Sequence, residues 1–175
     1  IQYLVVCLGA LRAGMVVVNT NPLYTERELE HQLNDANVRV MVVQANVAQT
    51  AAVVLPKTGV ETVVVTEIAD LHPQPKRTLI NFLVKYVKRM VPAFSIPGAL
   101  KLNAVLKAGA KTPYRAVILN RAELAMLQYT GGTTGVAKGA MLTHGNLIAN
   151  VLQSDAFFET HDIEGRGSTM LQPLP

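Results

Sequence analysis

The stretch from Tyr129 to Gly139, YTGGTTGVAKG, carries the residue types best suited to binding an anion. It holds four glycines, three threonines and one lysine within eleven positions. Glycine allows positive φ angles and a close approach of backbone to ligand, and successive free N–H groups in such a loop form a concave anion site. The threonine hydroxyls add hydrogen-bond donors, and Lys138 adds a positive charge. The pattern predicts a loop that binds a polyphosphate, because an ordinary turn needs only about one or two glycines.

Two common phosphate-binding motifs do not match this stretch. The Walker loop requires a glycine, a lysine and a hydroxyl residue in succession, but Lys138 lies between Ala137 and Gly139. A dinucleotide fingerprint requires the spacing G-x-G-x-x-G, but Gly131 and Gly132 are adjacent. The register of these residues therefore disfavours an unrelated P-loop nucleotidase.

The elements around the loop alternate between β-branched runs and helical patterns, which predicts βαβ units. The fold class we expect is α/β, a mostly parallel sheet with flanking helices. Thr25 and Glu28 form a capping box that opens a helix. The run MVVVNT at 15–20 is typical of a strand buried on both faces. We expect helices at 1–13 (ended by Gly14), 25–36, 46–55, 78–90, 99–108 and 146–158, and strands at 15–20, 38–43, 61–66, 123–130, 140–144 and 168–174.

Composition limits the class of protein. The chain has 175 residues, of which 50% are hydrophobic and 16% are charged, as expected for a globular domain. The single cysteine, Cys7, permits no internal disulfide and fits a cytoplasmic location. The four histidines have no metal-site spacing, and His144 is expected to be a structural hydrogen-bonding residue. Because the chain begins at Ile1 and ends with LQPLP, we expect a piece of a longer protein.

Residues 72–115 differ from the rest of the chain in charge. They contain nine Lys or Arg and no Asp or Glu, while the remainder, with seven basic and twelve acidic residues, carries a net charge of −5. We expect three regions: an α/β subdomain at 1–71, a basic, proline-punctuated insertion with amphipathic helices at 72–115, and an α/β segment with the loop at 116–175. The basic region suggests either an anionic partner or simple solvation.

The sequence KRTLINFLVKYVKRMVP, at 76–92, predicts a basic amphipathic helix. Such a helix either lies on an anionic membrane, at the inner face of the cell membrane, or packs on its own domain with a solvated basic face. A nucleic-acid partner is disfavoured because no recognition motif is present. The apolar side would hold Leu79, Phe82, Leu83, Tyr86 and Met90, and the polar side Asn81, Lys85, Lys88 and Arg89.

Residues 130–139 resemble the signature loop of the adenylate-forming (AMP-binding) superfamily, which reads roughly [ST]-[SG]-G-[ST]-[ST]-G-x-P-K-G. Ala137 stands where proline is usual. NTNPLYTERELEHQLNDA at 19–36 and MLTHGNL at 141–147 are similar to segments of bacterial long-chain fatty acid–CoA ligases, and PLP at 173–175 resembles the start of the next family motif. The resemblance covers most of the chain and is weakest in the basic region.

This resemblance implies part of the N-terminal domain of an enzyme that activates a long-chain fatty acid with ATP and Mg²⁺, then transfers it to coenzyme A. The C-terminal part is expected to be missing and the 175 residues alone to be inactive. Medium-chain or aryl acids, and a non-catalytic nucleotide- or membrane-binding module, are the alternatives; a homodimer is the candidate assembly. The implied ATP-phosphate residues are Tyr129, Thr130, Gly131, Gly132, Thr133, Thr134, Gly135, Val136, Ala137, Lys138, Gly139 and Ala140.

Overall fold

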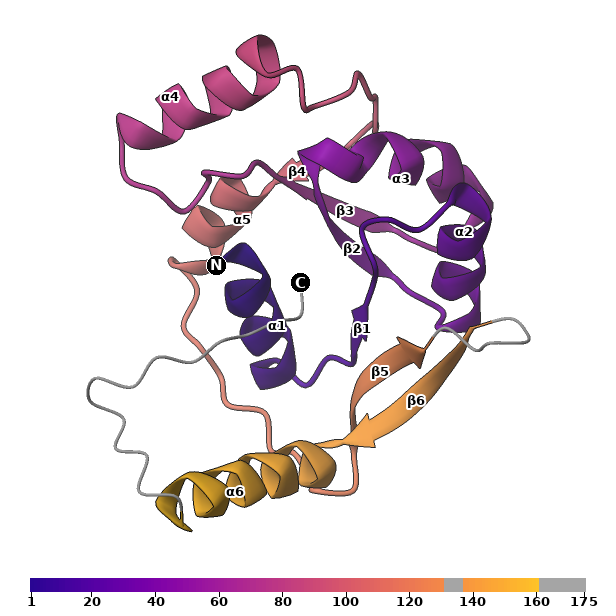
Figure 1. Ribbon diagram of the computed structural model, residues 1–175, viewed down its shortest axis with the longest axis vertical. Helices are drawn as coiled ribbons and strands as arrows, with labels where there is room; N and C mark the ends of the chain where they lie inside the picture. Colours follow the sequence, from indigo (N-terminus) through magenta and orange to yellow (C-terminus); the bar gives the residue numbers. More distant parts are fainter. Residues whose placement is uncertain (131–136, 161–175) are drawn as a thin grey trace.

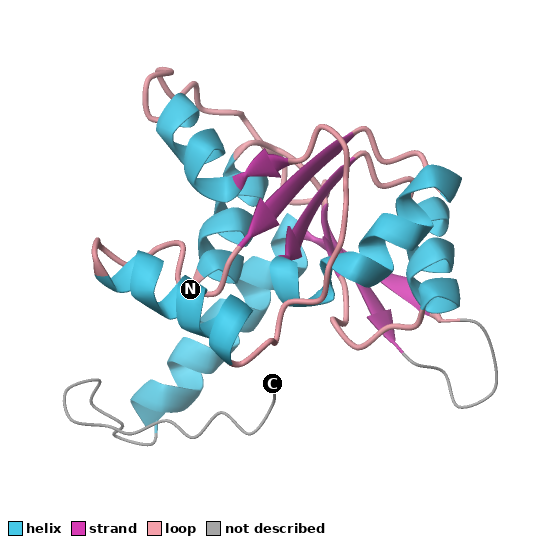
Figure 2. Cartoon of the chain, turned by 90° about the horizontal axis from the view of Figure 1, so that it is seen from above, coloured by secondary structure: helices cyan, strands magenta, loops and turns pink. Residues whose placement is uncertain are grey.

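The computed structural model describes residues 1–130 and 137–160, which form an α/β fold with two three-stranded sheets (Figure 1). Helices lie on both sides of the strands when the chain is seen from above (Figure 2). Three of the four strand pairings are parallel, so the predicted fold class is confirmed. The helices are α1 (Gln2–Arg12), α2 (Glu26–Asp35), α3 (Ala48–Val54), α4 (Lys76–Phe82), α5 (Leu102–Gly109) and α6 (His144–Thr160). The strands are β1 (Val17–Asn19), β2 (Val40–Gln44), β3 (Thr62–Thr66), β4 (Leu100–Lys101), β5 (Leu124–Thr130) and β6 (Lys138–Thr143).

The first sheet has the strand order β1-β5-β6 and brings together residues more than 100 positions apart. β1 runs parallel to β5, with Asn19 opposite Gln128. β5 and β6 pair antiparallel as a hairpin. The expected strand at 15–20 is shorter, and its predicted burial on both faces is wrong: Val17–Asn19 is half-buried and Met15 is exposed. β1 has a single strand neighbour among the described residues, which leaves one edge uncovered.

The second sheet has the order β2-β3-β4 and carries the main apolar core. Met41 and Val43 of β2 are buried while Val40 and Val42 are exposed, so helices cover one face of this strand. β4 and α5 come from the expected basic insertion, and β4 extends this sheet beside β3. The short turns η1 (Ala45–Val47) and η2 (Leu55–Lys57) flank α3. The core cluster consists of Leu29, Leu33, Met41, Val43, Ala48, Ala51 and Val54.

The ends of three helices follow directly from their capping residues. The Thr25 side chain accepts a hydrogen bond from the Glu28 N–H, and the Glu28 carboxylate accepts one from the Thr25 N–H, which confirms the predicted capping box of α2. Gly14, with φ of +74°, ends α1 as expected. α6 begins two residues before the predicted Asn146, because Thr143 and Asn146 exchange the same kind of hydrogen bonds.

The basic helix predicted at 78–90 is present as α4 followed by η3 (Leu83–Val87), a turn of π-helix. Its half-buried side contains Ile80, Asn81 and Val84. The Asn81 amide oxygen accepts the Ala69 N–H at 3.0 Å, and the amide nitrogen donates to the Glu67 carboxylate at 2.9 Å. Polar contacts through Asn81 therefore orient α4 on the domain.

The opposite side of α4 and η3 holds the predicted apolar residues, and all of them are exposed. Leu79 is 58% exposed and Phe82 is 54% exposed, and the rings of Phe82 and Tyr86 lie 5.1 Å apart. The helix thus packs on its own domain through the side that holds Asn81, while the predicted apolar side faces away from the other described residues. Membrane contact and a solvated basic face both stay predictions. No helix in residues 1–130 and 137–160 is long and apolar enough to cross a membrane. The strand predicted at 168–174 lies outside the described residues.

Candidate functional site

The predicted phosphate loop begins and ends on the hairpin of β5 and β6. Thr130 pairs with Lys138 and Tyr129 pairs with Gly139, so the residues just before and just after the loop lie side by side. The structure thus brings together six of the twelve predicted residues on the hairpin stems: Tyr129, Thr130, Ala137, Lys138, Gly139 and Ala140. The other six, at 131–136, lie outside the described residues.

Gly139 is required for close packing against the ring of Tyr129. A Cβ atom at position 139 would lie 2.9 Å from Tyr129 Cε2, closer than Cβ atoms approach other atoms in proteins, and 3.1 Å from Cζ. The ring is only 7% exposed. The glycine at this position therefore serves packing in the hairpin stem, in addition to any contact with a ligand.

The phenol of Tyr129 is tied to helix α2. Its hydroxyl donates a hydrogen bond to the carboxylate of Asp35. Burial, followed by the hydrogen bond and negative charge of Asp35, raises the pKa of Tyr129 to about 12. The phenol is therefore neutral at physiological pH and remains a hydrogen-bond donor to Asp35.

Helix α2 makes two further contacts at the same end of the first sheet. The His31 Nε2 atom lies 3.2 Å from the carbonyl oxygen of Ala137, the last residue before β6. The Gln32 amide nitrogen donates to the carbonyl oxygen of Asn19, at the end of β1, at 2.8 Å. α2 thus contacts one end of each strand of the first sheet, at the edge where the loop connects β5 to β6.

A polar network crosses the carboxyl ends of the two parallel strands. The Asn19 amide nitrogen donates to the Gln128 amide oxygen at 2.8 Å, and the Tyr3 hydroxyl donates to the Asn19 amide oxygen at 2.9 Å. The carboxyl ends of parallel strands are where α/β proteins bind ligands. The loop follows β5 at this edge, so its position agrees with that general rule.

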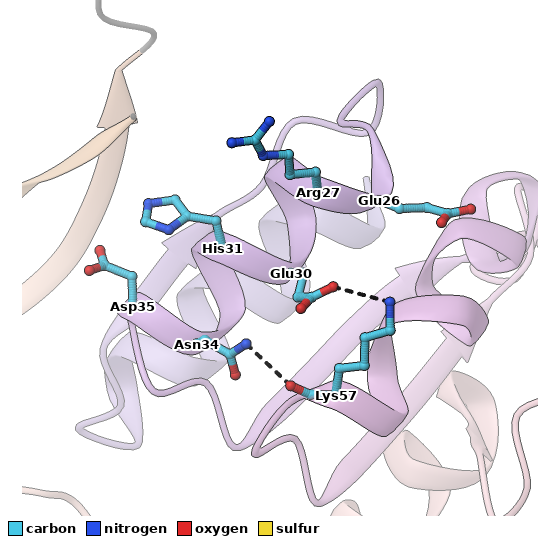
Figure 3. A pocket seen from close by; sticks show the side chains of 7 residues that line it. All are labelled: Glu26, Arg27, Glu30, His31, Asn34, Asp35 and Lys57. Carbon is cyan, nitrogen blue, oxygen red and sulfur yellow. Dashed lines mark hydrogen bonds and ion pairs between the residues drawn. The ribbon is translucent and has the colours of Figure 1, made fainter. Parts of the chain in front are cut away.

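An open depression lies on the outer side of α2 (Figure 3). Two contacts cross it: Lys57 Nζ to the Glu30 carboxylate at 3.4 Å, and the Asn34 amide nitrogen to the Lys57 carbonyl oxygen at 3.2 Å. Three of its seven lining residues are carboxylates, and this negative charge disfavours the binding of a polyphosphate there. The lining residues are Glu26, Arg27, Glu30, His31, Asn34, Asp35 and Lys57.

Sequence reasoning missed the contribution of His31 and Asp35. Their spacing of four residues after a predicted capping box places them on one side of a helix. That spacing contains no information about which strand they face, because the partners lie about a hundred positions away.

His144 opens α6, where its backbone N–H donates to the Glu123 carbonyl oxygen at 3.0 Å. No group of three potential metal ligands gathers among residues 1–130 and 137–160.

These features define a class: an α/β protein that presents a glycine- and threonine-rich hairpin loop at the carboxyl edge of a mixed sheet. The family model for the AMP-binding enzyme matches residues 1–175. The chain belongs to the AMP-binding enzyme family.

Similar proteins of known sequence or structure agree with this family. A long-chain-fatty-acid–CoA ligase of Escherichia coli O157:H7 is 51% identical over 158 residues, which cover 90% of this chain and 28% of the relative. A ligase of the same name from Bacillus subtilis strain 168 is 35% identical and covers 95% of this chain and 30% of the relative. The crystal structure of a long-chain-fatty-acid–CoA ligase from Archaeoglobus fulgidus superposes with a TM-score of 0.57, at 30% identity, over 87% of this chain and 25% of that one. The chain thus spans less than a third of the length of these relatives.

Proposed function

We propose that the full-length protein containing this chain joins a long-chain fatty acid to ATP and then to coenzyme A. A carboxylate oxygen attacks the α-phosphorus, the bond to pyrophosphate breaks, and an acyl-adenylate forms. The thiolate of coenzyme A then attacks the carbonyl carbon and AMP leaves. The observation that carries this proposal is the identity of about half of the residues with a protein named as such a ligase.

The first step faces electrostatic repulsion, which the loop is suited to offset. Two negative charges about 4 Å apart repel by roughly 1 kcal/mol in water and by about 4 kcal/mol at an effective dielectric constant near 20. We infer that the amides of Gly131, Gly132 and Gly135 and the hydroxyls of Thr130, Thr133 and Thr134 hold the β- and γ-phosphates. Lys138 would either neutralise charge or anchor the loop. Tyr129, Val136, Ala137, Gly139 and Ala140 would support the same loop.

Mg²⁺ would supply charge neutralisation between phosphate oxygens. It prefers oxygen ligands and usually one or two carboxylates. The threonine hydroxyls of the loop fit this preference, but no group of potential ligands gathers in the described parts of this chain. We infer that a carboxylate ligand comes from the remainder of the full-length protein. The division at 1–71, 72–115 and 116–175, and a homodimer, stay predictions for the intact protein.

ATP-dependent pyrophosphate release by the full-length protein, measured across fatty acids of increasing length, tests the proposal. We expect release that depends on a long-chain acid and falls strongly in Lys138→Ala. Preference for medium-chain or aryl acids would favour the alternative ligases. ATP binding without pyrophosphate release would favour a non-catalytic module. Unchanged ATP dependence in Lys138→Ala would refute the role of that lysine.

We also propose that the helix of α4 and η3 contacts the inner, cytoplasmic face of an anionic membrane. Two observations support this: the exposed apolar residues Leu79, Phe82, Tyr86 and Met90, and the absence of acidic residues from 72–115. Apolar side chains would enter the interface while Lys and Arg meet anionic headgroups, each cation contributing about 1 kcal/mol. Such contact would suit an enzyme whose substrate partitions into bilayers.

Flotation of the full-length protein with vesicles rich in phosphatidylglycerol tests the membrane contact. The triple variant Lys85→Glu, Lys88→Glu and Arg89→Glu should lose most of its vesicle-bound fraction. The matched control, Lys107→Glu, Lys111→Glu and Arg115→Glu, makes the same change in charge elsewhere in the basic segment and should float like the wild type. Equal flotation of both variants would remove the membrane proposal.

A further inference from the structure

Helix α2 holds both stems of the phosphate-loop hairpin. On the entry side, the Tyr129 hydroxyl at the end of β5 donates to Asp35. On the exit side, His31 Nε2 lies 3.2 Å from the Ala137 carbonyl oxygen. A carbonyl oxygen only accepts hydrogen bonds, so Nε2 must carry the proton of this contact. The two bonds therefore tie the end of the entry stem and the start of the exit stem to the same helix.

The two side chains act from a rigid support. His31 and Asp35 are one turn apart and lie on the same side of α2, away from Glu30 and Asn34, which face Lys57 (Figure 3). The opposite side of α2 buries Leu29 and Leu33 in the apolar core. Gln32, 1% exposed, binds α2 to the end of β1. Movement of the stems relative to α2 would therefore require breaking side-chain bonds on a helix that is itself fixed.

We propose that His31 and Asp35 are positioning residues, which fix the two stems of the hairpin, and with them Thr130 and Lys138, for contact with the phosphates of ATP. The inference rests on the proposed function. It gives α2, which lies about 100 residues upstream of the loop, a role in the same ATP-phosphate site. The hydrogen bond from His31 to the Ala137 carbonyl oxygen restricts the two rotatable backbone angles of Ala137, and so fixes where the exit stem begins. Tyr129 is restricted both by Asp35 and by the close packing with Gly139.

The test is the affinity for ATP of the full-length protein, measured by titration calorimetry with Mg²⁺ and without a fatty acid. His31→Leu removes the donor, and we expect the dissociation constant to rise about 3- to 10-fold, the range for one lost hydrogen bond. His31→Gln keeps a donor of similar reach and should stay within about twofold of the wild type. Asp35→Leu should also weaken binding, and Asp35→Asn, which keeps an acceptor, should restore it.

Asn34→Leu is the matched control. It removes a side-chain bond of the same length, 3.2 Å, from the same helix, but to Lys57 instead of the loop stem. We expect lower thermal stability and unchanged ATP affinity. Unchanged affinity in both His31→Leu and Asp35→Leu, or equal weakening by Asn34→Leu, would overturn the inference.

The same titration separates this inference from the proposed function. A wild type that binds ATP but forms no acyl-CoA would refute the ligase proposal, while the variants would still show whether α2 positions the loop. A wild type that makes acyl-CoA, with leucine variants that bind ATP equally well, would refute the positioning role alone. A wild type without ATP affinity would refute both.

Discussion

Replacing Gly139 with alanine should destabilise the hairpin stem. The added Cβ would lie 2.9 Å from Tyr129 Cε2, about 0.6 Å closer than a normal carbon contact of about 3.5 Å. The ring cannot easily move away, because it is buried and its hydroxyl is bound to Asp35. Overpacking of this kind costs roughly 1–3 kcal/mol, and alanine recovers about 0.5–1 kcal/mol of backbone entropy. We expect a net loss of about 1–2 kcal/mol.

Urea unfolding of the full-length protein, followed by far-UV circular dichroism and by tyrosine fluorescence, measures this loss. Gly9→Ala in α1 is the control, because a Cβ there meets no atom within 4 Å and alanine should stabilise the helix by about 0.5–1 kcal/mol. A double-mutant cycle with Tyr129→Phe adds a second test. Phenylalanine loses the bond to Asp35, so its ring can shift and Gly139→Ala should cost less in that background. An equal cost in both backgrounds, or a Gly139→Ala protein as stable as the wild type, would refute the packing argument.

Three further results are expected. Because folding raises the pKa of Tyr129 to about 12, its contribution to stability is complete below pH 10 and is lost as the pH rises from about 10 to 12. The free energy of unfolding should fall over this range by at most about 2.7 kcal/mol, or by roughly 1–2 kcal/mol after solvent screening. Tyr129→Phe should abolish this pH-dependent loss. Thr25→Ala should lower the unfolding free energy by about 1 kcal/mol through loss of the α2 cap, and Thr25→Ser should restore it. Asn81→Leu should cost about 1–3 kcal/mol and speed proteolysis around α4, because the Ala69 N–H and the Glu67 carboxylate lose their partner; proteolysis at the wild-type rate would count against the anchoring role of Asn81.

Local chemistry made several elements predictable. The capping box of Thr25 and Glu28 located the start of α2, and Gly14 located the end of α1. These signals act within one helical turn, so they are complete in the sequence. The glycine- and threonine-rich composition of residues 129–139 is also local, and the phosphate contact inferred from it stays a prediction.

The orientation of the basic helix was not predictable. Its apolar residues have helical spacing, which normally indicates the side that packs on the core. Asn81 reverses this arrangement by binding Ala69 and Glu67, so Ile80 and Val84 face the domain and Phe82 and Tyr86 face outward. Periodicity identifies an apolar side but not the surface it meets.

By itself, the sequence determined the α/β class, the start of α2 and the composition of the proposed phosphate loop, because each depends on residues close together in the chain. The tertiary structure alone decided that the strands divide into two sheets, that β1 pairs with β5, and that α2 holds the loop stems through His31 and Asp35. These contacts join residues about a hundred positions apart. Their formation depends on the combined packing of the core and strands, for which no local pattern carries the information.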